Sequence, residues 1–176
     1  MLHFSIHIET IYLPHQNYCM TNIPEITLLP FQPADQAAVK DLILAGLAEH
    51  WGTLDPSKNP DLDDIAASYA AASNLRVTFL VARYQDRIIG TGALVPRQNG
   101  IVEVVRMSVA ANWRRQGIGR MILQALVDRA RQDGFQRIIL ETTETWQEVI
   151  AFYLHFGFRI THYKDGDVYF ELTLVE

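Results

Sequence analysis

The segment at residues 106–126, RMSVAANWRRQGIGRMILQAL, changes its hydrophobic period partway along, and this change limits what the chain can fold into. The residues leading into it, GIVEVVRMSV, are rich in β-branched side chains and predict a long strand. From Gly117 the apolar positions recur about every 3.6 residues, which predicts an amphipathic helix ending at Asp133 and Gly134. The run RIILE then predicts a short buried strand. Residues 100–141 are therefore expected to form a strand, helix and strand whose two strands are parallel.

The remaining segments predict further strands and helices around this unit. Strands are expected at 25–31, 76–84, 87–95, 158–164 and 167–174. Helices are expected at 33–50 and 63–73. A further helix is expected to begin with a capping box at Thr145 and Glu148 and to end at Phe156. Short turns at residues 85–86 and 165–166 join strands as hairpins. The expected fold class is α/β of the α+β type: one domain with a mixed, mostly antiparallel sheet of about six to seven strands and about four helices.

The length of 176 residues suits one ordinary domain. A regular pattern begins near residue 25, so we expect an N-terminal extension at residues 1–24 and a single domain at 25–176. Residues 1–19 are interpreted either as an appendage or as the product of an upstream start.

Composition narrows the functional classes. A net charge of -5 argues against a polyanionic partner such as nucleic acid. Cys19 is the only cysteine, so no intramolecular disulfide can form and a cytoplasmic location is expected. No apolar run is long enough to span a membrane. The six histidines lack metal-ligand spacing, so no metal is expected.

The turn RRQGIGR has the features of an anion-binding site. The start of a helix exposes unpaired N–H groups, and this first turn has arginines where carboxylates usually lie. The alternative is that its glycines only shape the turn. It is not a Walker loop, since Arg120 and Met121 follow Gly119, and Ile122 replaces the third glycine of a dinucleotide fingerprint.

Residues 114–119 match the pattern R/Q-x-x-G-x-G/A between a strand and a helix, and VIAFYLHFGF places Tyr153 four residues ahead of Gly157 and Phe158. On these two motifs the chain resembles the GNAT superfamily of acyl-CoA N-acyltransferases, which hold the pyrophosphate of coenzyme A at this turn. The resemblance implies cofactor-binding roles for Met107, Ser108, Val109, Arg114, Arg115, Gln116, Gly117, Ile118, Gly119 and Arg120.

The resemblance also implies an activity. We expect transfer of an acetyl group from acetyl-CoA to the primary amine of a small molecule or peptide, by direct attack and without a metal. A homodimer through the C-terminal strands is a further expectation, with DVYFELTL as the edge. One alternative is a noncatalytic acyl-CoA-binding module that regulates a protein partner. A nucleotide-binding domain is another, disfavoured by the missing lysine and glycine.

Two side chains are expected to carry the chemistry. Tyr153 is the general acid that the resemblance implies, although its helical spacing also suits the core. Glu103 is the candidate base, on the strand face predicted to hold Ile101, Val105 and Val109; the alternative is an ion pair with a neighbouring strand or with Arg106. Glu141 and Thr142 are weaker candidates.

One position departs from the family pattern. Many members have asparagine seven residues before the tyrosine, where it helps to position the cofactor, and this chain has Trp146. The acceptor is expected to meet the first two helices and their loop. His50 and Trp51 either line that pocket or cap the first helix. Four carboxylates there either favour a cationic acceptor or stabilise the second helix: Asp55, Asp61, Asp63 and Asp64.

Overall fold

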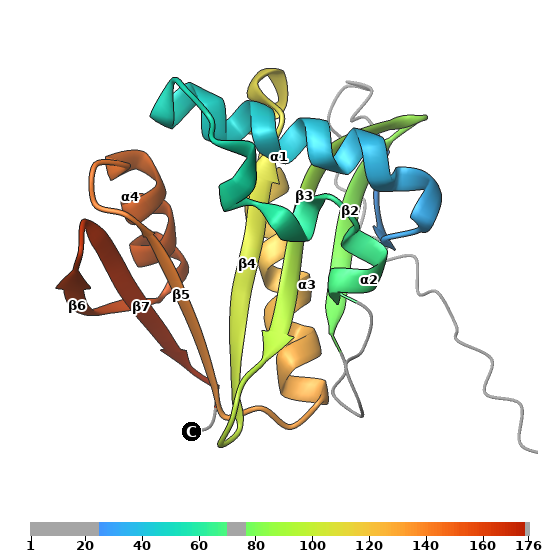
Figure 1. Ribbon diagram of the computed structural model, residues 1–176. Helices are drawn as coiled ribbons and strands as arrows, with labels where there is room; N and C mark the ends of the chain where they lie inside the picture. The colour runs from blue at the N-terminus through green and yellow to red at the C-terminus, as the bar shows by residue number, and fades with distance from the viewer. Residues whose placement is uncertain (1–24, 70–76, 175–176) are drawn as a thin grey trace, which may run out of the picture.

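The computed structural model describes residues 25–69 and 77–174. The predicted extension at 1–24 and the end of the predicted second helix lie outside them. Within the described ranges one sheet has the strand order β1-β2-β3-β4-β5-β7-β6 (Figure 1). Its strands are β1 (Ile26–Pro30), β2 (Thr78–Tyr84), β3 (Arg87–Pro96), β4 (Ile101–Val109), β5 (Arg137–Thr143), β6 (Arg159–Lys164) and β7 (Asp167–Thr173). The α-helices are α1 (Gln36–Trp51), α2 (Ile65–Tyr69), α3 (Ile118–Gln132) and α4 (Gln147–Phe156).

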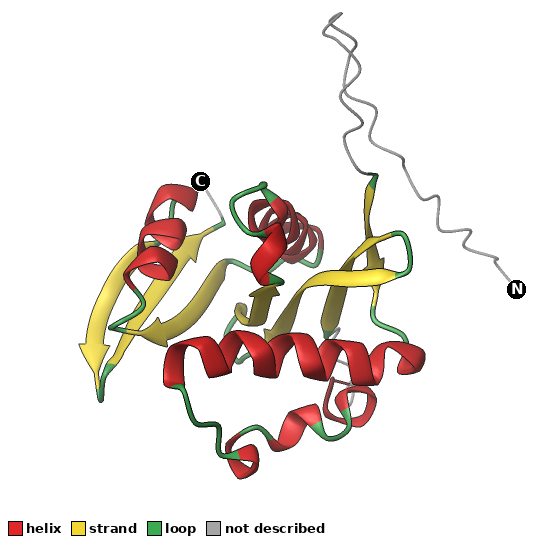
Figure 2. Ribbon diagram, turned by 90° about the horizontal axis from the view of Figure 1, so that it is seen from above, coloured by secondary structure: helices red, strands yellow, loops and turns green. Residues whose placement is uncertain are grey.

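Helices cover both faces of the sheet (Figure 2). α1 and α2 pack on one face over a core of Val39, Ile43, Leu62, Ile65, Phe79, Val81 and Ala93. α3 and α4 pack on the other face over a larger core that includes Ile118, Ile122, Leu126, Ile150 and Phe170. The predicted α+β class, with seven strands mostly antiparallel, is confirmed.

β3 allows α3 to approach the sheet closely because it has glycine at its centre. A Cβ atom on Gly92 would lie 2.6 Å from Met107 Sδ and 2.8 Å from Ile122 Cγ2. Such distances are far inside van der Waals contact, so a side chain there would displace the Met107 and Ile122 side chains. The absence of a side chain at Gly92 therefore lets α3 pack closely on β3.

β4 and β5 separate partway along their length. Their parallel pairing joins Ile101–Glu103 of β4 only to Arg137–Ile139 of β5. β4 continues to Val109 and β5 to Thr143, and Figure 1 shows the two strands diverging beyond the paired part. Backbone N–H and C=O groups on the facing edges of this gap therefore have no strand partner across it.

A β-bulge at Arg106 changes which way the end of β4 faces. Between the pairs of Thr91 with Ser108 and Ala93 with Val105, two residues of β4 oppose one of β3. Arg106 has φ +55°, and the Thr91 hydroxyl donates to its carbonyl oxygen at 2.9 Å. Val105 packs toward α1, whereas Met107 and Val109 pack toward α3. The prediction that Val109 shares a face with Val105 is therefore wrong, because the bulge shifts the alternation by one residue.

Two other local predictions are wrong. α4 begins at Gln147 with Trp146 as its N-cap and no side-chain capping bond, because a turn with Trp146 N–H donating to the Thr143 carbonyl precedes it. Glu148 pairs with Arg115 instead of closing a capping box at Thr145. The segment DVYFELTL is not a sheet edge, since β7 lies between β5 and β6; β1 and β6 are the edges.

Candidate active site

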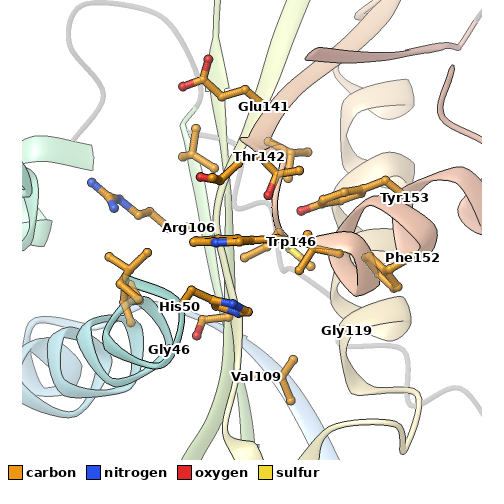
Figure 3. A pocket seen from close by; sticks show the side chains of 18 of the residues that line it. Gly46, His50, Arg106, Val109, Gly119, Glu141, Thr142, Trp146, Phe152 and Tyr153 are labelled. Carbon is orange, nitrogen blue, oxygen red and sulfur yellow. The ribbon is translucent and has the colours of Figure 1, made fainter. Parts of the chain in front are cut away.

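A cavity of about 1180 Å³ lies where β4 and β5 diverge. Its walls come from the end of α1, the bulged half of β4, the end of β5, the turn before α3, and α4 (Figure 3). Such a concave pocket in the middle of the sheet is the default ligand site of the fold. Most of the residues that the sequence singled out meet there.

The turn before α3 forms the cationic end of this cavity. Gly117, at φ +84°, is the N-cap of α3 and adopts a left-handed conformation that other residues rarely reach. The first intrahelical bond runs from the Met121 N–H to the Gly117 carbonyl, so the preceding N–H groups have no helical partner. The first turn of α3 contains no carboxylate.

Three arginines surround these N–H groups. Arg114 pairs with Glu49 and its Nε donates to the Val109 carbonyl at 3.0 Å. Arg115 pairs with Glu148, but both side chains are more than four-fifths exposed, so the pair is easily exchanged. The Arg120 guanidinium lies 5.4 Å above the Phe156 ring and takes part in no ion pair within the described ranges. Guanidinium groups beside a free helix N-terminus fit phosphate oxygens.

Two predicted cofactor residues lie outside the cavity lining. The Ile118 side chain is 2% exposed and packs in the core. The Gln116 side chain donates a hydrogen bond to the Asn112 carbonyl, which stabilises the turn before α3. The lining includes the other predicted positions: Met107, Ser108, Val109, Arg114, Arg115, Gly117, Gly119 and Arg120.

The end of β4 presents backbone donors to the gap. The Ala110 N–H donates to the Ile89 carbonyl of β3 at 2.9 Å. Because successive N–H groups of a strand point to opposite edges, those of Val109 and Met107 point away from β3 and toward the gap. The Ser108 side chain turns instead to α1, where its hydroxyl lies 3.5 Å from the Leu42 carbonyl.

Tyr153 combines a core ring with a hydroxyl that faces the cavity. Its side chain is 5% exposed, and its ring contacts the rings of Phe152, Phe158 and Phe170. Burial raises the pKa of its hydroxyl well above the ordinary value, so the group stays protonated at neutral pH. Within the described residues no hydrogen bond reaches this hydroxyl, and Figure 3 shows it directed into the pocket. The core position predicted for the ring is therefore confirmed, and the general-acid role of the hydroxyl stays a prediction.

Glu103 lies in the cavity wall and is held by an arginine. Arg97, one residue beyond β3, donates from Nε at 2.7 Å and from Nη2, both to Glu103 Oε2. The ion pair foreseen as the alternative for Glu103 is thus present, although Arg106 is not its partner. Glu103 Oε1 accepts no hydrogen bond from the described residues.

Hydrogen bonds of Arg106 connect the β4 bulge to the loop between α1 and α2. Its guanidinium donates to both carboxylate oxygens of Asp61 and, at 2.9 Å, to Asn59 Oδ1, while the Tyr69 hydroxyl donates to Asp61 at 2.7 Å. Burial opposes ionisation of Asp61, but the hydrogen bonds from Arg106 and Tyr69 outweigh it and lower the pKa of the carboxyl. Burial and the bond to Asp61 raise the pKa of Tyr69 to about 12. Asp61 and Tyr69 line the cavity.

The four loop carboxylates weighed for a cationic acceptor are all engaged within the chain. Asp61 pairs with Arg106 and Asp63 with Lys40, while Asp64 accepts the Ala67 N–H and Asp55 accepts from Ser57. Two other carboxylates line the cavity on its β5 and β7 side, Glu141 and Asp167. Neither has an ion-pair partner in the part of the chain that the structure describes. The nearby Glu141 carboxylate raises the pKa of the Tyr169 hydroxyl through a hydrogen bond and its charge.

An aromatic bridge, formed by His50, Trp51 and Trp146, crosses the cavity mouth. The rings of His50 and Trp146 stack with centroids 4.2 Å apart, and the Trp51 ring lies 5.4 Å from that of Trp146. The bridge joins the end of α1 to the start of α4. Sequence reasoning noted Trp146 only as a departure, because nothing in the local pattern reveals a partner almost a hundred residues away.

Comparisons with known proteins identify the family of this chain. The chain matches the model of the Acetyltransferase (GNAT) family over residues 43–158. It is 32% identical over 137 residues to the IAA acetyltransferase of Azospirillum brasilense, covering 77% of this chain and 86% of the relative. It is 28% identical over 138 residues to the uncharacterized N-acetyltransferase YjgM of Escherichia coli (strain K12), covering 75% and 81%.

A solved structure supports the same fold. The model superposes on the PaiA N-acetyltransferase of Thermoplasma acidophilum, solved in complex with coenzyme A, with a TM-score of 0.76 at 16% identity; the match covers 85% of this chain and 99% of that one. The family match identifies this α+β sheet, with its diverging central strands, as that of an acyl-CoA-dependent acyltransferase. The chain belongs to the acetyltransferase (GNAT) family and is an acyl-CoA-dependent N-acetyltransferase.

The described residues contain no helix long and apolar enough to cross a membrane. In the same ranges no group of three or more His, Cys, Asp or Glu side chains is placed to hold a metal ion.

Proposed function

We propose that this protein moves the acetyl group of acetyl-CoA directly to a primary amine of a small molecule or peptide. The observation that carries the proposal is that one cavity contains both the cationic turn and, at a distance from it, the unpartnered hydroxyl of Tyr153. A long phosphate-bearing thioester fits such an arrangement, with its phosphates at the turn and its reactive end near the tyrosine. The thioester supplies an activated acyl group.

Different groups of the chain bind the phosphates and the thioester carbonyl. The free N–H groups at the start of α3, with Arg114, Arg115 and Arg120, hold the phosphates. The N–H groups of Met107 and Val109 donate to the thioester carbonyl oxygen, where negative charge develops during attack. Fixed backbone donors of this kind do not need to reorganise when the charge appears.

Proton transfer needs a donor and an acceptor. Tyr153, kept neutral by its burial, gives its proton to the departing thiolate. Glu103 takes the proton of the attacking amine through water, and its Oε1 is the oxygen available for this because Arg97 contacts only Oε2. Arg97 thereby positions the carboxylate in the wall of the cavity.

The charges of the cavity support an amine acceptor. On the side away from the α3 turn, Arg97 and Arg106 are each paired with a carboxylate. Among the described residues Glu141 and Asp167, on β5 and β7, have no ion-pair partner, so this side of the cavity carries a negative charge and attracts an ammonium group. The noncatalytic alternative is not favoured, because named N-acetyltransferases are among the relatives.

Substituting Glu103 by glutamine tests the assignment of the base. We expect kcat to fall by about 100-fold, the usual contribution of a general base, with little change in the Kd of acetyl-CoA. The measurement is a steady-state assay of free thiol with a panel of amines.

Glu171→Gln is the matched control. Glu171 is also a largely buried strand glutamate paired with arginines, Arg137 and Arg159, but it lies outside the cavity lining. Equal losses of kcat in the two variants would mean that Glu103 has only a structural role.

A further inference from the structure

The indole N–H of Trp146 is a buried donor with no acceptor. Its Nε1 atom is shielded from solvent and makes no hydrogen bond to any residue in the described ranges. No other buried side-chain nitrogen or oxygen of those ranges is left in this condition. A folded chain normally satisfies such groups, because an unpaired buried donor destabilises it. The exception lies in the wall of the cavity, where a bound molecule can supply the acceptor.

The aromatic bridge fixes the position of this donor. Trp146 immediately precedes α4, and its ring is held against His50 of α1 at 4.2 Å and 25°. In Figure 3 the indole lies between His50 and Tyr153, in front of β4. The bridge therefore lies in the lining of the same cavity as the α3 turn and the Tyr153 side chain.

We propose that the aromatic bridge covers the pantetheine arm of the bound acyl donor, and that the Trp146 indole N–H donates a hydrogen bond to an amide carbonyl of that arm. This inference rests on the proposed function, since it requires coenzyme A in the cavity. The arm is the part of the donor that joins the phosphates to the thioester. It carries two amide carbonyls, each an acceptor able to satisfy the indole.

The neighbours of Trp146 favour the arm over the amine acceptor as its partner. The α4 residues of the cavity lining include Val149, Phe152 and Tyr153, and Phe152 lies 3.7 Å from the position of a Cβ on Gly119. Trp146 thus belongs to the wall that leads from the α3 turn to the reaction centre. The uncompensated carboxylates that attract an amine, Glu141 and Asp167, lie on β5 and β7 instead.

Substituting Trp146 by phenylalanine separates this role from a structural one. Phenylalanine keeps an aromatic ring against His50 but removes the N–H group. We expect the Kd of coenzyme A, measured by isothermal titration calorimetry, to rise by about 3- to 10-fold, which corresponds to one hydrogen bond. The unliganded variant should melt at the same temperature as the wild type or higher, because an unsatisfied buried donor has been removed.

Three comparisons make the test specific. 3′-Phosphoadenosine 5′-diphosphate has all the phosphates of coenzyme A but no arm, so its stabilisation of the protein in thermal unfolding should be equal in wild type and Trp146→Phe. Trp113→Phe removes an indole that packs on Tyr84 outside the cavity lining, and it should leave the Kd of coenzyme A unchanged. His50→Leu keeps the indole N–H but removes the stacked ring, and it should weaken coenzyme A in the same direction as Trp146→Phe.

An unchanged Kd for coenzyme A in Trp146→Phe would overturn the inference, as would an equal loss of affinity for 3′-phosphoadenosine 5′-diphosphate. A raised KM for the amine with an unchanged Kd for coenzyme A would also overturn it, by placing the indole against the acceptor. If the wild type itself bound no coenzyme A, the proposed function would fail first.

Discussion

We expect Tyr153→Phe to lower kcat by about 100-fold while leaving the Kd of acetyl-CoA nearly unchanged. The phenylalanine ring can keep the contacts with Phe152, Phe158 and Phe170, so the variant should fold with a free energy of unfolding within about 1 kcal/mol of the wild type. Only the hydroxyl that faces the cavity is lost. The thiolate must then leave without a positioned proton donor.

The measurement for Tyr153→Phe is a steady-state assay beside titration calorimetry of acetyl-CoA. Tyr163→Phe is a suitable control, because this tyrosine is 60% exposed on the edge strand β6 and outside the cavity lining. If Tyr153→Phe kept the wild-type kcat, the tyrosine would belong to the core alone.

The second large effect concerns stability. Asp61→Asn should reduce the free energy of unfolding at about pH 7 by roughly 2 kcal/mol, because the partly buried Arg106 loses its charged partner. Asp63→Asn is its control: the Asp63 carboxylate is 71% exposed and pairs with Lys40, so its loss should change stability by less than about 0.5 kcal/mol. Urea unfolding of both variants measures the difference.

This effect depends on pH in a definite direction. The folded-state pKa of Asp61 is lowered from its usual 3.8, so the carboxylate stabilises the fold above that value. Its contribution is lost as the pH falls through the lowered folded-state pKa. The stability difference between the wild type and Asp61→Asn should therefore shrink in acid. A difference that stayed constant down to about pH 3 would show that the charge of Asp61 contributes little.

The elements of the fold followed from the sequence because their signals are local. The change of period at Gly117 marks the start of α3, and the glycine after Asp133 marks its end. The position of β7 between β5 and β6 did not follow, because the order of strands depends on long-range packing that a hairpin pattern does not contain. The edge was consequently placed on the wrong strand.

The site was predictable where it depends on a contiguous turn. Residues 114–119 were located by their pattern, and Tyr153 by its spacing from Gly157. The bulge was not foreseen, because GIVEVVRMSV reads as an unbroken strand and an arginine at positive φ has no compositional signature. The contact between His50 and Trp146, which joins segments far apart in the sequence, was equally hidden.

Thermal unfolding of the purified protein with and without acetyl-CoA tests the central claim most directly, with ATP and NAD as controls. Acetyl-CoA at about 100 times its Kd should raise the melting temperature by roughly 5 to 10 °C, and the two controls should not. No shift with millimolar acetyl-CoA, or an equal shift with ATP, would contradict the assignment of the cavity to an acyl-CoA donor.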